Sequence, residues 1–118
     1  MLSYMKKNNT VETAVNALED MKGNDITVID TQGKTDVFDA MIIVTGTSDR
    51  HVKSLADNVV KDVKSKGLGV MGVEQDRSWI LVDLCDVVVH IMLEETREFY
   101  SLEKLWEIST DRKQVSLT

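Results

Sequence analysis

Four side chains between positions 83 and 90 could take part in chemistry: the carboxylates of Asp83 and Asp86, the thiol of Cys85 and the imidazole of His90. An enzyme that binds a divalent metal beside a triphosphate needs carboxylates two residues apart on one strand face. Asp83 and Asp86 are instead three residues apart and span a turn. Cys85 and His90 lack a third group that would orient them for thiol chemistry. The spacing therefore predicts neither a catalytic residue nor a metal site.

The segment Thr45-Gly-Thr-Ser-Asp-Arg-His51 is a second candidate site, because a strand is expected to end there and a helix to begin. Backbone amides at the N-terminus of a helix can hold an anion. The residues that would do so are Gly46, Thr47, Ser48 and Arg50. The alternative is a well-capped strand-to-helix turn without a ligand. The segment has neither the lysine of a Walker motif nor the glycine pattern of a dinucleotide-binding loop.

The hydrophobic pattern places both segments in one domain, expected over residues 10–107, with flexible ends at 1–9 and 108–118. Thr10 is the expected cap of the first helix, and Ser48 or Asp49 the expected cap of the second. The predicted helices cover residues 10–21, 49–66, 94–100 and 102–106. The predicted strands cover residues 26–30, 38–45, 70–74, 79–83 and 87–92. This order predicts an α/β fold with a mixed β-sheet of about five strands flanked by helices.

The hairpin formed by residues 79–83 and 87–92 has two faces of different composition. If Asp83 pairs with Asp86 across the turn, side-chain alternation makes one face aliphatic, with Ile80, Val82, Val87, Val89 and Ile91. The other face carries Trp79, Leu81, Asp83, Asp86, Val88 and His90. An aromatic residue among carboxylates and aliphatic residues is typical of a protein interface. The alternative is that Trp79 belongs to the core and that the aspartates serve the turn.

The charge of the chain favours a basic partner over nucleic acid. With 14 Lys and Arg against 20 Asp and Glu, the formal net charge is −6. Proteins that bind nucleic acid through phosphates need a basic surface, so we expect little direct nucleic-acid contact. An acidic surface suits a basic protein, although the same charge could serve solubility alone.

The composition also limits the location and cofactors of the protein. We find neither an apolar run long enough to span a membrane nor the pattern of a secretory signal. The lone Cys85 argues against a disulfide framework or a zinc site. We therefore expect a cytoplasmic protein that needs no cofactor.

Three motifs together resemble one protein family. They are the Thr45–His51 segment, the stretch from Asp83 to Met92, and the Glu94-Glu-Thr-Arg-Glu-Phe-Tyr-Ser-Leu-Glu-Lys-Leu-Trp106 segment that follows. In this order they resemble the ribosomal silencing factor family, also called Iojap-like, and the likeness runs from about Asp25 to Trp106. The resemblance implies a nucleotidyltransferase-like topology without its catalytic carboxylates. It also implies a non-enzymatic protein that binds the large ribosomal subunit and blocks subunit joining, repressing translation.

The resemblance implies a partner and contact residues as well. The expected partner is a large-subunit protein of the L-fourteen kind, and the expected contacts are Trp79, Asp83, Leu84, Asp86, Glu98 and Tyr100. A homodimer that buries the Trp79 face is a further hypothesis for the free protein. A nucleotidyltransferase-like nucleotide-binding protein or enzyme is the alternative function. The chain departs from the family at Cys85, where members commonly have glycine, and in the length of its tail after Trp106.

Overall fold

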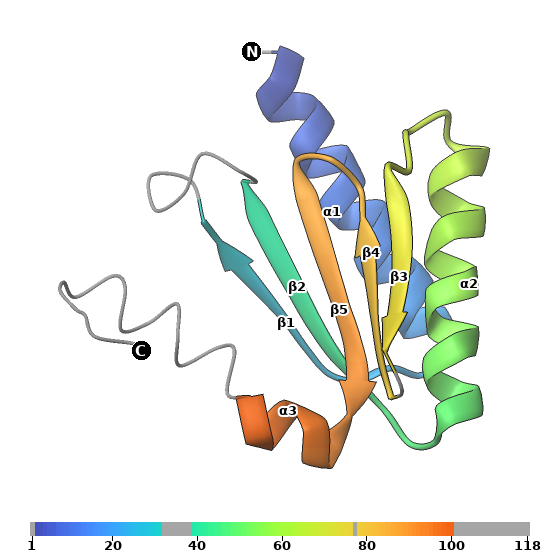
Figure 1. Ribbon diagram of the computed structural model, residues 1–118. Helices are drawn as coiled ribbons and strands as arrows, with labels where there is room; N and C mark the ends of the chain where they lie inside the picture. Colours follow the sequence, from blue (N-terminus) through green and yellow to red (C-terminus); the bar gives the residue numbers. More distant parts are fainter. Residues whose placement is uncertain (1, 32–38, 77, 101–118) are drawn as a thin grey trace, which may run out of the picture.

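The fold is a five-stranded sheet with helices packed on it. The computed structural model describes residues 2–31, 39–76 and 78–100 of the chain. Its strands follow the order β1-β2-β5-β4-β3 across the sheet, as Figure 1 shows. Along the chain the elements are α1 (Leu2–Asp20), β1 (Asn24–Asp30), β2 (Ala40–Gly46), α2 (Asp49–Ser65), β3 (Gly72–Asp76), β4 (Trp79–Asp83), β5 (Val87–Leu93) and α3 (Glu94–Tyr100).

The sheet is mixed, as the sequence predicted. The pair β2 and β5 is parallel, while the pairs β1–β2, β3–β4 and β4–β5 are antiparallel. Every residue of β2 is buried. The strand lies between β1 and β5, and its alternating side chains pack into hydrophobic clusters on both faces of the sheet. Its nearly continuous apolar sequence is the pattern expected of a strand buried on both faces. Residues 32–38, which include the predicted turn and the predicted start of this strand, lie outside the described part of the chain.

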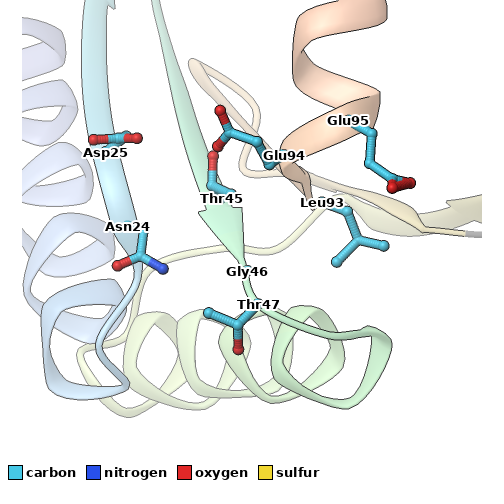
Figure 2. Close-up of a pocket in the computed structure, with 8 residues that line it drawn as sticks. All are labelled: Asn24, Asp25, Thr45, Gly46, Thr47, Leu93, Glu94 and Glu95. Atoms are coloured by element: carbon cyan, nitrogen blue, oxygen red, sulfur yellow. The ribbon is translucent and has the colours of Figure 1, made fainter.

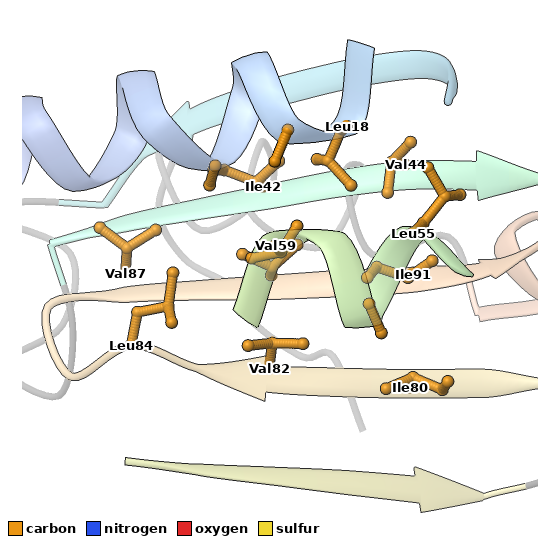
Figure 3. Packing of buried hydrophobic residues seen from close by; sticks show 14 of the residues in the cluster. Leu18, Ile42, Val44, Leu55, Val59, Ile80, Val82, Leu84, Val87 and Ile91 are labelled. Atoms are coloured by element: carbon orange, nitrogen blue, oxygen red, sulfur yellow. The ribbon is translucent and has the colours of Figure 1, made fainter. Parts of the chain in front are cut away.

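Helices α1 and α2 cover one face of the sheet and close the main core over it. Side chains from both helices meet β2, β4 and β5 there, and Figure 3 shows Leu18, Leu55 and Val59 among them. Helical spacing predicts a buried stripe on α2 made of Val52, Leu55, Ala56, Val59, Val60 and Val63. All of these are buried except Val60, which is half-buried. Ser48 is the N-cap of α2, and its side chain accepts a hydrogen bond from the amide of His51. Gly67, just after the helix, has a φ of +76°.

The first helix begins at Leu2, so the prediction that Thr10 caps it is wrong. Nothing in the first residues breaks a helix: neither proline nor glycine precedes Thr10. Thr10 lies inside the helix and is buried. Flexibility of residues 1–9 stays a prediction. The predicted helix at 102–106 and the predicted tail at 108–118 lie outside the described residues.

Strand β3 covers residues later than the predicted 70–74, because its position is set by pairing with β4. The register joins Gly72 to Asp83 and Asp76 to Trp79. Asp76 was expected in a loop, since a polar residue at a strand end gives no hydrophobic signal. Backbone pairing with β4 holds it in the sheet.

The β4–β5 hairpin is wider than predicted. Asp83 pairs with Val88 rather than Asp86, so the register is shifted by two residues. A Leu84-Cys85-Asp86 turn intervenes, in which the Cys85 amide donates to Oδ1 of Asp83 at 2.9 Å. Because side chains alternate with a period of two, a shift of two residues keeps each of them on its predicted face.

The backbone of Cys85 has a φ of +78°, a conformation that favours glycine. We expect Cys85→Gly to raise the free energy of unfolding by about 0.5–1 kcal/mol, because it removes the Cβ strain at a small cost in chain entropy. Chemical denaturation would measure the change. Cys85→Ala is the matched control, since it removes the thiol but keeps the Cβ. Equal stability of the two variants would show that the strain is not significant.

Candidate partner-binding face

The sheet face turned away from α1 and α2 carries the predicted mixture of aromatic, acidic and aliphatic side chains. In the main core, Ile80, Val82 and Val89 face the two helices. Met41, Ile43 and Met92 form a second small core on the opposite face, with Ile29 and Trp79 packed against it. The predicted division of the hairpin into two faces is therefore confirmed. Trp79 agrees with both interpretations of the sequence, the core residue and the interface residue. It packs on the second core cluster and yet is only partly buried.

A hydrogen bond from Trp79 to His90 fixes the orientation of the indole ring. Nε1 of Trp79 donates to Nδ1 of His90 at 3.0 Å, and the two rings lie 5.6 Å apart at a tilt of 53°. Burial lowers the pKa of His90 from 6.5 to about 4, because a charged imidazole would lose its hydration. His90 is therefore neutral near pH 7, with Nδ1 free of a proton and able to accept this bond.

Two acidic residues that the sequence analysis did not select lie beside Trp79. Asp76 pairs with Trp79 across β3 and β4, and Glu74 pairs with Leu81. Both carboxylates belong to exposed residues. With Gln75, these four residues line a hollow of about 220 Å³. Once the last residue of β3 was known, the pairing of β3 with β4 would have been enough to place both residues on this face.

The predicted contact residues differ in how exposed they are and in where they lie. Asp83 and Asp86 are half-buried at the hairpin turn, and Glu98 is exposed on α3. Leu84 is instead buried in the main core, as Figure 3 shows, so its side chain offers little surface to a partner. Tyr100 ends α3, and its side chain is outside the described residues. The face accordingly centres on Trp79, Leu81 and the acidic residues of β3, while Asp83 and Asp86 lie at the opposite end of β4.

Helix α3 is fixed to the sheet by Arg97, a buried residue to which the sequence analysis gave no role. Its guanidinium donates to the backbone oxygen of Asp25 at 2.7 Å. It also donates to the hydroxyl oxygens of Thr45 and Thr27, each at 2.9 Å. These contacts tie the helix that carries Glu98 to β1 and β2. This role could not be predicted from the sequence, because the three acceptors lie far from Arg97 along the chain.

The turn at Gly46 is held by internal hydrogen bonds. The amide of Thr47 donates to Nδ1 of His51 at 2.9 Å, and the amide of His51 donates to Oγ of Ser48 at 3.1 Å. On its other side, Nε2 of His51 lies 2.7 Å from the carbonyl oxygen of Met21. Two amides that an anion would need are thus already paired. A Cβ on Gly46 would lie 2.7 Å from Val52, so packing against α2 explains the glycine.

The cavity beside this turn has an acidic lining. It measures about 510 Å³, and Asp25, Glu94 and Glu95 contribute to its wall, as Figure 2 shows. Carboxylates at the rim repel an anion, and the exposed Arg50 is not among the lining residues. This geometry supports the capped turn, the alternative that the sequence had left open, over the anion site.

The described residues contain neither a metal-binding cluster nor a membrane-spanning helix. Across 2–31, 39–76 and 78–100, no three or more His, Cys, Asp or Glu side chains gather where they could hold a metal ion. No helix within those ranges is long and apolar enough to cross a membrane. The carboxylate of Asp83 has a structural partner in the amide of Cys85.

Comparison with known proteins gives consistent matches. The model of the family described as "Ribosomal silencing factor during starvation" matches residues 4–118. The ribosomal silencing factor of Chromobacterium violaceum is 47% identical over 95 residues, which cover 79% of this chain and 78% of that protein. That of Haemophilus influenzae is 45% identical over 98 residues, which cover 81% of this chain and 96% of that protein. An X-ray structure of a Chromobacterium violaceum protein superposes with a TM-score of 0.82 at 40% identity, covering 94% of this chain and 92% of that one.

These matches confirm the resemblance that the three sequence motifs suggested. The family model spans nearly the whole chain, and the two relatives agree with it in name. The superposition extends the likeness to the fold. The chain belongs to the ribosomal silencing factor family.

Proposed function

We propose that this chain binds the large ribosomal subunit through a basic protein of the L-fourteen kind and thereby blocks joining of the small subunit. The observation that carries the proposal is the sheet face on which Trp79 and Leu81 of β4 lie beside the acidic residues Asp76 and Glu74 of β3. The relatives named ribosomal silencing factors support the ribosomal partner. The proposal places the chain in the cytoplasm, where free subunits meet.

The face has the properties of a surface that recognises a basic protein. A partly buried tryptophan supplies contact area, and its bond to His90 holds the ring in one orientation before binding. A side chain that is already ordered loses less entropy on association. The carboxylates of Asp76 and Glu74 on β3 lie beside Trp79 and Leu81, and they complement Lys and Arg on a partner. We assign Asp83, Asp86, Glu98 and Tyr100 to the same contact, while Leu84 acts through the core.

The proposed mechanism is steric and requires no chemical step. Occupancy of large-subunit surface that the small subunit needs would prevent association and lower translation. Nanomolar affinity corresponds to roughly 12 kcal/mol, which an interface of ordinary size with a few aromatic anchors can supply. The half-buried Trp79 gives less support to a homodimer, since it leaves a smaller apolar patch on the free chain than the sequence suggested.

Co-sedimentation with separated ribosomal subunits tests the proposal. We expect wild type to pellet with large subunits and not with small ones, and Trp79→Ala/Tyr100→Ala to bind at least tenfold more weakly. Met21→Ala/Val28→Ala is the matched control, because both residues are exposed and apolar. Met21 follows α1, and Val28 pairs with Ile42, a residue of the helix-covered core. Circular dichroism would establish that all variants fold.

A second assay tests the proposed consequence of binding. Wild type, but not Trp79→Ala/Tyr100→Ala, is expected to reduce the formation of complete ribosomes from mixed subunits in a sucrose gradient. Failure to bind either subunit would overturn the proposal. Binding to large subunits without any effect on joining would contradict the steric mechanism alone.

A further inference from the structure

Strand β3 lies at one edge of the sheet, and no described element pairs with its outer side. It pairs with β4 and ends the strand order β1-β2-β5-β4-β3. Figure 1 shows it at the border of the sheet beside β4. Four of its five residues are exposed, and Gly72 is half-buried. The outward N–H and C=O groups of an edge strand can pair with a strand from another chain.

The side chains of β3 present two different surfaces along this edge. Glu74 and Asp76 point to the face of Trp79 and Leu81, with which they pair. On the other face Val73 is 50% exposed, and Met71, just before the strand, is 68% exposed. Edge strands are commonly protected by lysine, proline or a bulge. Between Met71 and Asp76 the sequence contains neither lysine nor proline.

The charges of β3 argue against a second copy of the chain as the occupant of this edge. Antiparallel pairing of two β3 strands about Glu74 would set that residue opposite its own copy. Pairing about Gln75 would instead set Glu74 opposite Asp76. Like charges directly opposite each other destabilise a strand pair. A strand that carries basic residues meets no such repulsion.

We infer that β3 receives an extended, basic segment of a partner protein as a sixth strand of the sheet. Lysine or arginine at alternate positions of that segment would lie beside Glu74 and Asp76, and its intervening residues would cover Val73. Backbone hydrogen bonds supply affinity in this mode, and alternate side chains supply specificity. The inference rests on the proposed function, because it specifies how the large-subunit protein meets the acidic face around Trp79.

Hydrogen exchange of the full chain, alone and with purified large ribosomal subunits, tests this inference directly. We expect exchange of the amides in residues 72–76 to slow at least tenfold in the complex. Strand β1, at the opposite edge of the same sheet, is the internal control and is expected to exchange unchanged. If the β3 amides were already protected in the chain alone, and the chain alone formed a dimer in sedimentation equilibrium, a second copy would be the occupant. That result would overturn the inference.

Charge reversal gives an independent measurement. Glu74→Lys/Asp76→Lys is expected to weaken binding to large subunits at least tenfold. Glu19→Lys/Asp20→Lys is the matched control with the same change in net charge, on exposed positions at the end of α1. Binding with unprotected β3 amides, or equal loss in both variants, would overturn the inference and leave the proposed function standing. Absence of binding by wild type would overturn both.

Discussion

Replacing Arg97 with methionine is expected to lower the free energy of unfolding by about 3 kcal/mol. Arg97 is buried, and its guanidinium donates to the carbonyl of Asp25 and to the hydroxyls of Thr45 and Thr27. Methionine has a similar length but no donor. The hydroxyl of Thr45, which is only 3% exposed, would then lose a charged donor that water could not easily replace.

Urea denaturation would measure the Arg97→Met effect, and two variants would define its cause. Arg97→Lys keeps the charge, but an ammonium group cannot reproduce the planar fork that reaches three acceptors, so we expect an intermediate loss. Arg50→Met removes an exposed arginine and is expected to change stability by less than about 0.5 kcal/mol. If Arg97→Met were as stable as Arg50→Met, the bonds of Arg97 would not anchor α3. Under the proposed function, binding to large subunits should fall as well, because Arg97 positions the helix that carries Glu98, one of the proposed contacts.

The layers of the fold follow from the hydrophobic pattern because burial acts on whole stripes and faces. Val52, Leu55 and Val59 recur at helical spacing, which fixed α2 and its buried side before any contact was known. The strands of the hairpin alternate, so their two faces were correct even though the register was wrong. Register depends on the shape of the turn. Cys85 adopts a left-handed backbone conformation in this turn, and cysteine is not a residue type from which that conformation is predicted.

The candidate site was less predictable, because its residues come together through pairing between distant segments. Trp79 and Asp83 stood out by type, whereas Glu74 was placed at the end of a predicted strand and Asp76 in the loop after it. Only the pairing of β3 with β4 brings both beside Trp79 and Leu81. Leu84 was assigned to the partner through the family resemblance, as part of the motif around the turn. Its side chain instead completes the core, which adjacency in sequence could not show.

Lowering the pH is expected to destabilise the protein through His90. Burial lowers the pKa of His90 to about 4, from 6.5 in a solvated histidine. Above pH 6.5 the imidazole is neutral in both the folded and the unfolded chain, so proton binding by His90 does not lower the free energy of unfolding. Between pH 6.5 and about 4 only the unfolded chain takes up the proton, and stability falls as the pH falls. The free energy of unfolding then falls by an amount that approaches 1.4 kcal/mol per pH unit, which makes about 3 kcal/mol between pH 6.5 and about 4.

His90→Asn separates the contribution of His90 from that of every other titrating group. Oδ1 of asparagine can take the place of Nδ1 as acceptor for Nε1 of Trp79, but it does not titrate. Urea denaturation from pH 7 to pH 4 should therefore show a shallower loss of stability in His90→Asn than in wild type. The difference should develop below pH 6.5 and level off near pH 4. Parallel curves would mean that His90 takes up its proton at the same pH in the folded and the unfolded chain, so that folding does not lower its pKa.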